Sequence, residues 1–316
     1  MAESRRFDSF QKWALLTTFA TFFLIGLGGL VRASGSGLGC PDWPRCFGLI
    51  VPPTHVSELP PSFDPASFNV VKTWIEYTNR MVGATIGLLI FATMVSAFRN
   101  HRDERRVLWP TVAAFLCVGF EGWLGALVVR SELRPALVTA HLLLALVLVG
   151  LLLYATVNAF YGPPRSKAEV PEALRRLERW AILLLLLGLV QTGLGAMVRG
   201  TIDTVVIAEP GLLRGTWLAE VGPLDLVHRQ IGALTFLCTL VVAGLTLRNR
   251  QIHPHLRRTA IVMLSFCAVQ IGLGLTLAYA ELPPAAQMLH ILVGSLLIGS
   301  DMVLAFLARR LPLIAT

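Results

Sequence analysis

Charge is scarce in this sequence of 316 residues, because Asp, Glu, Lys and Arg together make up only 15% of it. Hydrophobic residues account for 55%, and the mean hydropathy is +0.67. Such a scarcity of charge argues against a soluble domain of this length. It predicts a multi-pass membrane protein whose main surroundings are the lipid bilayer.

Eight apolar runs are long enough to cross a bilayer as helices, so we predict an all-α integral membrane protein with eight transmembrane helices. The first run follows Arg5 and Arg6, as in a signal peptide, but it is longer than a usual signal-peptide core. We therefore expect it to remain as a helix. The runs cover residues 13–33, 74–97, 107–129, 136–158, 179–199, 224–247, 258–280 and 284–308.

The net charge of +8 could indicate a nucleic-acid partner, but the placement of the charge favours a topology signal and no nucleic acid. Arg and Lys gather before the first run, in every second connection and after the last run. This distribution predicts that both termini are cytoplasmic. Transit-peptide character is missing, which favours a bacterial cytoplasmic membrane. The basic residues include Lys12, Arg99, Arg102, Arg105, Arg106, Arg165, Lys167, Arg175, Arg176, Arg179, Arg248, Arg250, Arg257, Arg258, Arg309 and Arg310.

The second half of the chain repeats the first. Residues 76–84 read EYTNRMVGA and residues 225–233 read DLVHRQIGA, an offset of 149 that also carries His141 onto His290. The first span matches the fifth at an offset of 167, through Gly-Leu-Gly and Val-Arg in each. Equivalent helices are separated by four spans, an even number, so the two copies run in the same direction through the membrane.

This repeat predicts two tandem four-helix bundles. We expect an N-terminal half over residues 1–160, a cytoplasmic linker over 161–178 and a C-terminal half over 179–316.

Three of the seven histidines lie a few residues inside even-numbered spans, near the predicted outer face: His141, His228 and His290. Ionisable groups inside a membrane are costly and usually functional. Such a histidine can make an interhelical hydrogen bond, relay protons, bind a metal or bind haem iron. The other four are expected in loops and in contact with solvent: His55, His101, His253 and His255.

His228 and His290 are 62 residues apart on parallel helices at matching depth, which suits the two axial ligands of a haem. Carboxylates that could complete a non-haem metal site are few. The same spacing pairs His141 with Asn79, and a carboxamide is a poor iron ligand. We therefore expect a six-coordinate haem in the second half. The first half would bind haem through His141 alone, with an open position, or would have lost its site.

Charged side chains surround these positions. Glu76 lies one helical turn before Asn79 and Asp225 lies one turn before His228, so each carboxylate shares a face with a ligand position. Such a carboxylate can act as a base or orient a ligand; it can also cap the helix or pair with Arg80. Several arginines could bind haem propionates or extend to the interface: Arg32, Arg80, Arg130, Arg199 and Arg229.

Cys40 and Cys46 lie in the first outer loop, where an oxidising compartment allows a disulfide. A zinc site would need more ligands nearby than the sequence offers. The matching loop of the second half has no cysteine, which favours a redox or haem-handling role over a structural one.

With these residues the chain resembles the haem A synthase family over nearly its whole length. The resemblance is carried by the stretch GGLVRASGSGLGCPDWP over residues 28–44, by Trp74-Ile75-Glu76-Tyr77 before Asn79-Arg80, and by His141, His228-Arg229 and His290.

The resemblance implies an oxidoreductase of cytochrome oxidase assembly that oxidises the C8 methyl group of haem O to the formyl group of haem A. It implies a haem b cofactor on His228 and His290 with Arg229 nearby, and a haem O substrate at His141, Asn79 and Arg80. Glu76 would be catalytic, and a haem O synthase and oxidase-assembly proteins would be partners. The chain departs from the family at Asn79, where a fourth histidine is usual. A non-catalytic electron-transfer or haem-handling protein remains the alternative.

Overall fold

The computed structural model describes residues 7–209 and 211–314, and this part of the chain is helical and contains no strand. Eight of its helices are long and apolar enough to cross a membrane, as predicted. Arg5 and Arg6 lie outside the described residues. The eight helices are α1 (Ser9–Ala33), α2 (Val70–Asn100), α3 (Arg105–Arg130), α4 (Pro135–Tyr161), α5 (Glu172–Ala208), α7 (Pro223–Leu247), α8 (Pro254–Tyr279) and α9 (Pro284–Ala308).

Local signals set where these helices begin. Proline stands at the first position of α4, α7, α8 and α9, where its missing N–H costs no helical hydrogen bond. Asp8 caps α1 by accepting from the Gln11 N–H at 2.8 Å, and Asn69 caps α2 by accepting from the Lys72 N–H at 3.0 Å. Four short helices lie in the connections: η1 (Val56–Glu58), η2 (Pro65–Ser67), η3 (Arg214–Thr216) and α6 (Trp217–Val221).

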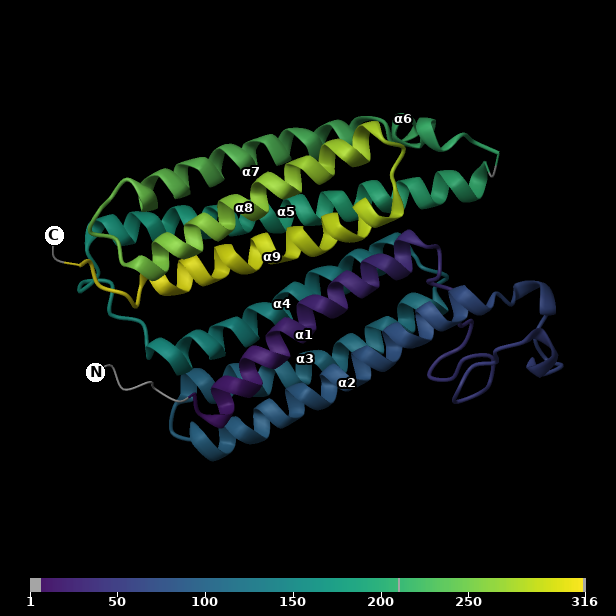
Figure 1. Cartoon of the computed structure of the whole chain (residues 1–316), viewed down its shortest axis with the longest axis horizontal. Helices are drawn as coiled ribbons and strands as arrows, with labels where there is room; N and C mark the ends of the chain where they lie inside the picture. Colours follow the sequence, from purple (N-terminus) through teal and green to yellow (C-terminus); the bar gives the residue numbers. More distant parts are fainter. Residues whose placement is uncertain (1–6, 210, 315–316) are drawn as a thin grey trace.

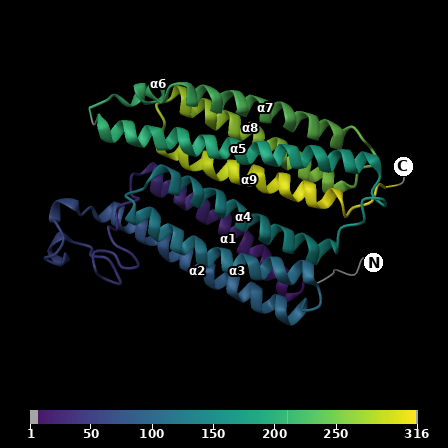
Figure 2. The ribbon, with the colours of Figure 1, turned by 180° about the vertical axis from the view of Figure 1, so that it is seen from behind.

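The long helices form two groups of four that lie side by side, α1–α4 in one and α5, α7, α8 and α9 in the other (Figures 1 and 2). α1 and α4 pack against α9 at the seam, where Phe22, Leu146 and Ile298 share one buried cluster. Gly299 allows a close approach there, because an added Cβ would lie 2.6 Å from Cζ of Phe22. α5 begins at Glu172, so the connection between the groups is shorter than the expected linker 161–178.

The repeat is visible in the backbone. Glu132 and Leu133, between α3 and α4, have φ angles of 54° and 62°, and Glu281 and Leu282, between α8 and α9, have 58° and 53°. Residues other than glycine rarely adopt this left-handed conformation. The same unusual turn therefore leads into α4 and into α9, the two helices that carry His141 and His290.

Both described ends of the chain lie at one end of the molecule, opposite the long loop that joins α1 and α2 (Figure 1). His101 lies at the same end as the termini and is only 7% exposed. Its ring nitrogens contact Glu104 at 2.9 Å and Asp8 at 3.1 Å. The expectation of a solvated loop histidine was wrong, because Asp8, remote in sequence, folds against it.

Candidate functional site

The four helices that carry the ligand positions inferred from the repeat, α2, α4, α7 and α9, begin at the end of the molecule that carries the long loop (Figure 1). Each ligand position lies within the first ten residues of its helix: Asn79 in α2, His141 in α4, His228 in α7 and His290 in α9. Because the four helices start at the same end, the side chains share one level of the bundle.

In the second half, His228 and His290 lie close enough to interact electrostatically. Each is packed on a glycine of a neighbouring helix. A Cβ built on Gly195 would lie 2.9 Å from Cε1 of His228, and one on Gly274 would lie 3.5 Å from Cε1 of His290. The first distance is shorter than carbon atoms tolerate, so Gly195 is needed for His228 to keep its position.

A glutamine lies beside each of these rings, and the sequence pattern did not single out either one. Nε2 of Gln191 is 3.5 Å from Nε2 of His228, and Gln270 lies beside His290. Oε1 of both glutamines and Nδ1 of both histidines are buried and have no hydrogen-bond partner within the described residues. Each ring therefore has a nitrogen that no protein group occupies, and a neutral imidazole with a free ring nitrogen can bind iron. The donor set therefore fits a haem with two histidine ligands.

In the first half, His141 has a different neighbour. Its Nδ1 contacts Oε2 of Glu121, a carboxylate of α3 that is only 6% exposed. Gly125 lies under the ring, with an added Cβ 3.7 Å from Cε1. The sequence pattern also missed Glu121, although at the offset of 149 its equivalent position in the second copy is Gln270.

Asn79 leaves space that the second half does not have. Gly28 is the repeat counterpart of Gly195, yet a Cβ added to Gly28 would meet nothing within 4 Å. Oδ1 of Asn79 is buried and has no hydrogen-bond partner among the described residues. The first site is therefore more open than the second on the side facing α2.

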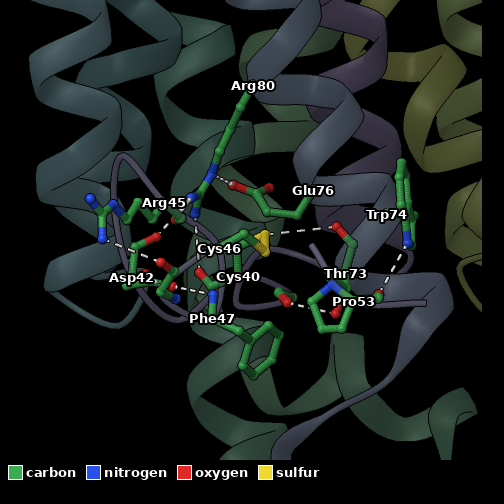
Figure 3. The surroundings of a disulfide bond; sticks show 12 residues. Cys40, Asp42, Arg45, Cys46, Phe47, Pro53, Thr73, Trp74, Glu76 and Arg80 are labelled. Atoms are coloured by element: carbon green, nitrogen blue, oxygen red, sulfur yellow. Dashed lines mark hydrogen bonds and ion pairs between the residues drawn. A yellow bond between two sulfur atoms is a disulfide. The ribbon is translucent and has the colours of Figure 1, made fainter. Parts of the chain in front are cut away.

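Glu76 and Arg80 form a buried pair on α2, with Nε of Arg80 2.9 Å from Oε1 of Glu76. The remaining donors of Arg80 bind backbone carbonyls of the long loop: Cys40 at 3.1 Å, Asp42 at 2.7 Å and Arg45 at 3.0 Å (Figure 3). Glu76 is 5% exposed and lies near enough to His141 to interact with it electrostatically. Arg80 thus joins the loop to the carboxylate beside the first site.

The second half has the equivalent carboxylate–arginine pair, but no long loop lies over it. Nη2 of Arg229 lies 2.8 Å from Oδ2 of Asp225, and the Arg229 side chain is 43% exposed. The repeat therefore conserves the charge pair, and the long loop makes the first copy different.

The loop is held by the Cys40–Cys46 disulfide, and both cysteines are buried (Figure 3). Thr73, in the first turn of α2, donates to the Gly39 carbonyl at 2.8 Å. A Cβ on Gly39 would lie 2.2 Å from the Lys72 carbonyl oxygen, so only glycine permits this docking. The disulfide loop, residues 39–48, is thereby fixed on the start of α2, directly before Glu76.

Comparison with known proteins agrees with this architecture. A family described as "Cytochrome oxidase assembly protein" matches residues 11–301. The chain is 28% identical to the haem A synthase of Allorhizobium ampelinum, over 91% of this chain and 87% of that protein. It is 24% identical to the haem A synthase of a Caulobacter species, over 94% and 95%. It is 25% identical to that of Shewanella oneidensis, over 88% and 90%.

Proposed function

The chain belongs to the cytochrome oxidase assembly protein family, and from this premise we propose that it acts as a haem A synthase. It would be a membrane oxidoreductase that converts haem O to haem A by oxidising the C8 methyl group to a formyl group. The observation that carries the proposal is the inequality of the two sites. The second offers two histidines to one haem, whereas the first offers one histidine, an open side and a buried carboxylate.

In the second half, His228 and His290 would hold a haem b, with the Gln191 amide beside the His228 ring and Gln270 beside the His290 ring. When bound, this haem supplies electron transfer. Arg229, at the same level of α7, is placed to bind a propionate through the guanidinium donors that Asp225 does not use.

In the first half, His141 would bind the iron of haem O, whereas Asn79 offers a carboxamide, which is a poor iron ligand. Glu76 would act beside the methyl group as the acceptor of its protons. Arg80 holds one oxygen of Glu76 in place and binds the disulfide loop, so it would orient the base and cover the substrate. Cys40 and Cys46 support this cover.

The charge distribution supports the further proposal that both termini lie in the cytoplasm of a bacterial cell and that the haem sites lie near the outer face of its cytoplasmic membrane. We propose the halves 1–160 and 179–316 as the substrate and cofactor units. Haem O would reach the first site from a haem O synthase, and haem A would leave toward oxidase-assembly proteins.

Co-expression with a haem O synthase tests the function directly. The purified protein should yield haem b together with haem A or its hydroxylated precursor, separated by chromatography and identified by mass. Protein that retains haem b and yields neither product would contradict the proposal and favour a non-catalytic electron-transfer or haem-handling role.

Glu76→Gln tests the role given to the carboxylate. Haem A formation should fall about 100-fold or more, because positioned proton transfer contributes that much, while haem b content is unchanged. Asp225→Asn is the matched change in the second half. This change should lower the haem b content of the protein. Haem A formation by the fraction of protein that is fully loaded with haem b should be affected less.

A further inference from the structure

The role of Glu121 is not explained by the proposed function. It lies on α3, 6% exposed, and its Oε2 contacts Nδ1 of His141 on α4. Both of its carboxylate oxygens are buried, and neither makes a hydrogen bond of ordinary geometry within the described residues. No Arg or Lys pairs with Glu121 in the part of the chain that the structure describes. A carboxylate at this depth is costly unless it serves a purpose.

The repeat provides an internal comparison for this contact. Gln270 occupies the position of Glu121 in the second copy and lies beside His290, the counterpart of His141. The glycines under the two rings leave similar room, 3.7 Å at Gly125 and 3.5 Å at Gly274. Both histidines follow the same left-handed turn. The glycine and the turn match in the two copies, whereas the side chain on the neighbouring helix is a carboxylate in the first and an amide in the second.

We propose that Glu121 is a positioning residue that makes His141 a stronger electron donor to substrate iron than His290 is to cofactor iron. Across the contact between its Oε2 and Nδ1 of His141, Glu121 would accept the Nδ1–H, which would fix the tautomer and leave Nε2 for the iron. A carboxylate acceptor gives the imidazole more anionic character than an amide does. This inference rests on the proposed function in one respect, that a haem binds at His141.

The consequence is a difference in redox behaviour between the two sites. Electron donation from His141 stabilises ferric iron relative to ferrous iron, so the haem at His141 has a lower reduction potential than an amide neighbour would give. Stronger donation from His141 also compensates for the poor ligand at position 79. A single strong histidine can hold the substrate haem without help from Asn79.

Exchanging the two acceptors tests the proposal, with Glu121→Gln in the first half and Gln270→Glu as the matched reciprocal. The readouts are potentiometric titration of each haem and the iron–histidine stretching band in resonance Raman spectra. Both are recorded on full-length protein loaded with haem b and haem O. Glu121→Gln should raise the potential of the haem at His141, lower its iron–histidine frequency and weaken its binding about ten-fold or more. Gln270→Glu should lower the potential of the haem on His228 and His290.

The unchanged site in each variant reports whether the protein has folded. Glu121→Gln with both the potential and the stretching band at wild-type values would overturn the inference, even if the wild type makes haem A. A shifted potential in a protein that makes no haem A would leave the inference standing and contradict the proposed function. Absence of any haem at His141 would overturn both.

Discussion

Arg32 of α1 and Arg199 of α5 bind the same carboxylate. Nη2 of Arg32 lies 3.1 Å from Oδ2 of Asp203, and Nη1 of Arg199 contacts Oδ1. The two arginines are counterparts in the repeat, at the offset of 167. Because α1 and α5 belong to different groups of helices, Asp203 joins the two halves at the end that carries the sites. Both arginines, which the sequence offered as partners for haem propionates, therefore already pair with a carboxylate of the protein.

Replacing Asp203 should weaken this junction. Asp203→Asn leaves two partly buried guanidinium groups without their counter-charge, and we expect a loss of about 1–2 kcal/mol in the free energy of unfolding in detergent. Glu172→Gln is the control, because Glu172 also pairs with two arginines, Arg175 and Arg179, but is 63% exposed. Its effect should stay below about 0.5 kcal/mol. Equal effects of the two changes would argue against a special junction.

Gly195→Ala should disrupt the second site. The new Cβ would stand 2.9 Å from Cε1 of His228, so the ring must move away from its position. We expect loss of the six-coordinate low-spin haem spectrum and a lower haem b content per protein. Gly28→Ala, the same change in the first copy, meets nothing within 4 Å and should leave haem b content at the wild-type level. Unaltered haem b spectra in Gly195→Ala would show that His228 does not bind haem in this position.

Arg80→Lys should loosen the disulfide loop. An ammonium group cannot reproduce the planar set of bonds that Arg80 makes to Glu76 and to three loop carbonyls. Hydrogen exchange measured by mass spectrometry should become faster in residues 39–48, and haem A formation should fall. Arg229→Lys changes the uncovered pair of the second half, and exchange in the loop should remain at the wild-type rate. If exchange in the loop is equally slow in both variants, Arg80 does not hold it.

Asn79→His should complete the ligand set of the first half. The side chain has room, because no atom lies within 4 Å of a Cβ on Gly28, whereas Gly195 is tightly packed against His228. We expect a second six-coordinate low-spin haem in electron paramagnetic resonance spectra and tighter haem binding at His141. Asn79→Gln is the control of similar size and should add no such signal. A protein with one low-spin haem in both variants would place position 79 away from the haem.

Much of the architecture is determined by the sequence alone, for a physical reason. The bilayer core contains no water to hydrogen-bond backbone N–H and C=O groups or to solvate charges, so a spanning segment must be a long, apolar helix. The eight helices can therefore be located from the composition along the chain. The repeat likewise needs only the offset of 149, and it placed His228 against Asn79 before any coordinates. The Cys40–Cys46 disulfide also joins cysteines close in sequence, which proximity and an oxidising loop allow.

The contacts that distinguish the two copies were decided only by tertiary structure. Glu121 meets His141, Arg80 meets the loop carbonyls and Arg32 meets Asp203 because of how each helix is rotated and which loop docks on it. A linear pattern contains the spacing of residues within one helix but not the rotation of one helix against another. Apolar composition is similar on all faces of these spans, so it does not specify that rotation. The rotation of each helix is specified by side-chain packing at the seam and by the docking of the long loop on α2.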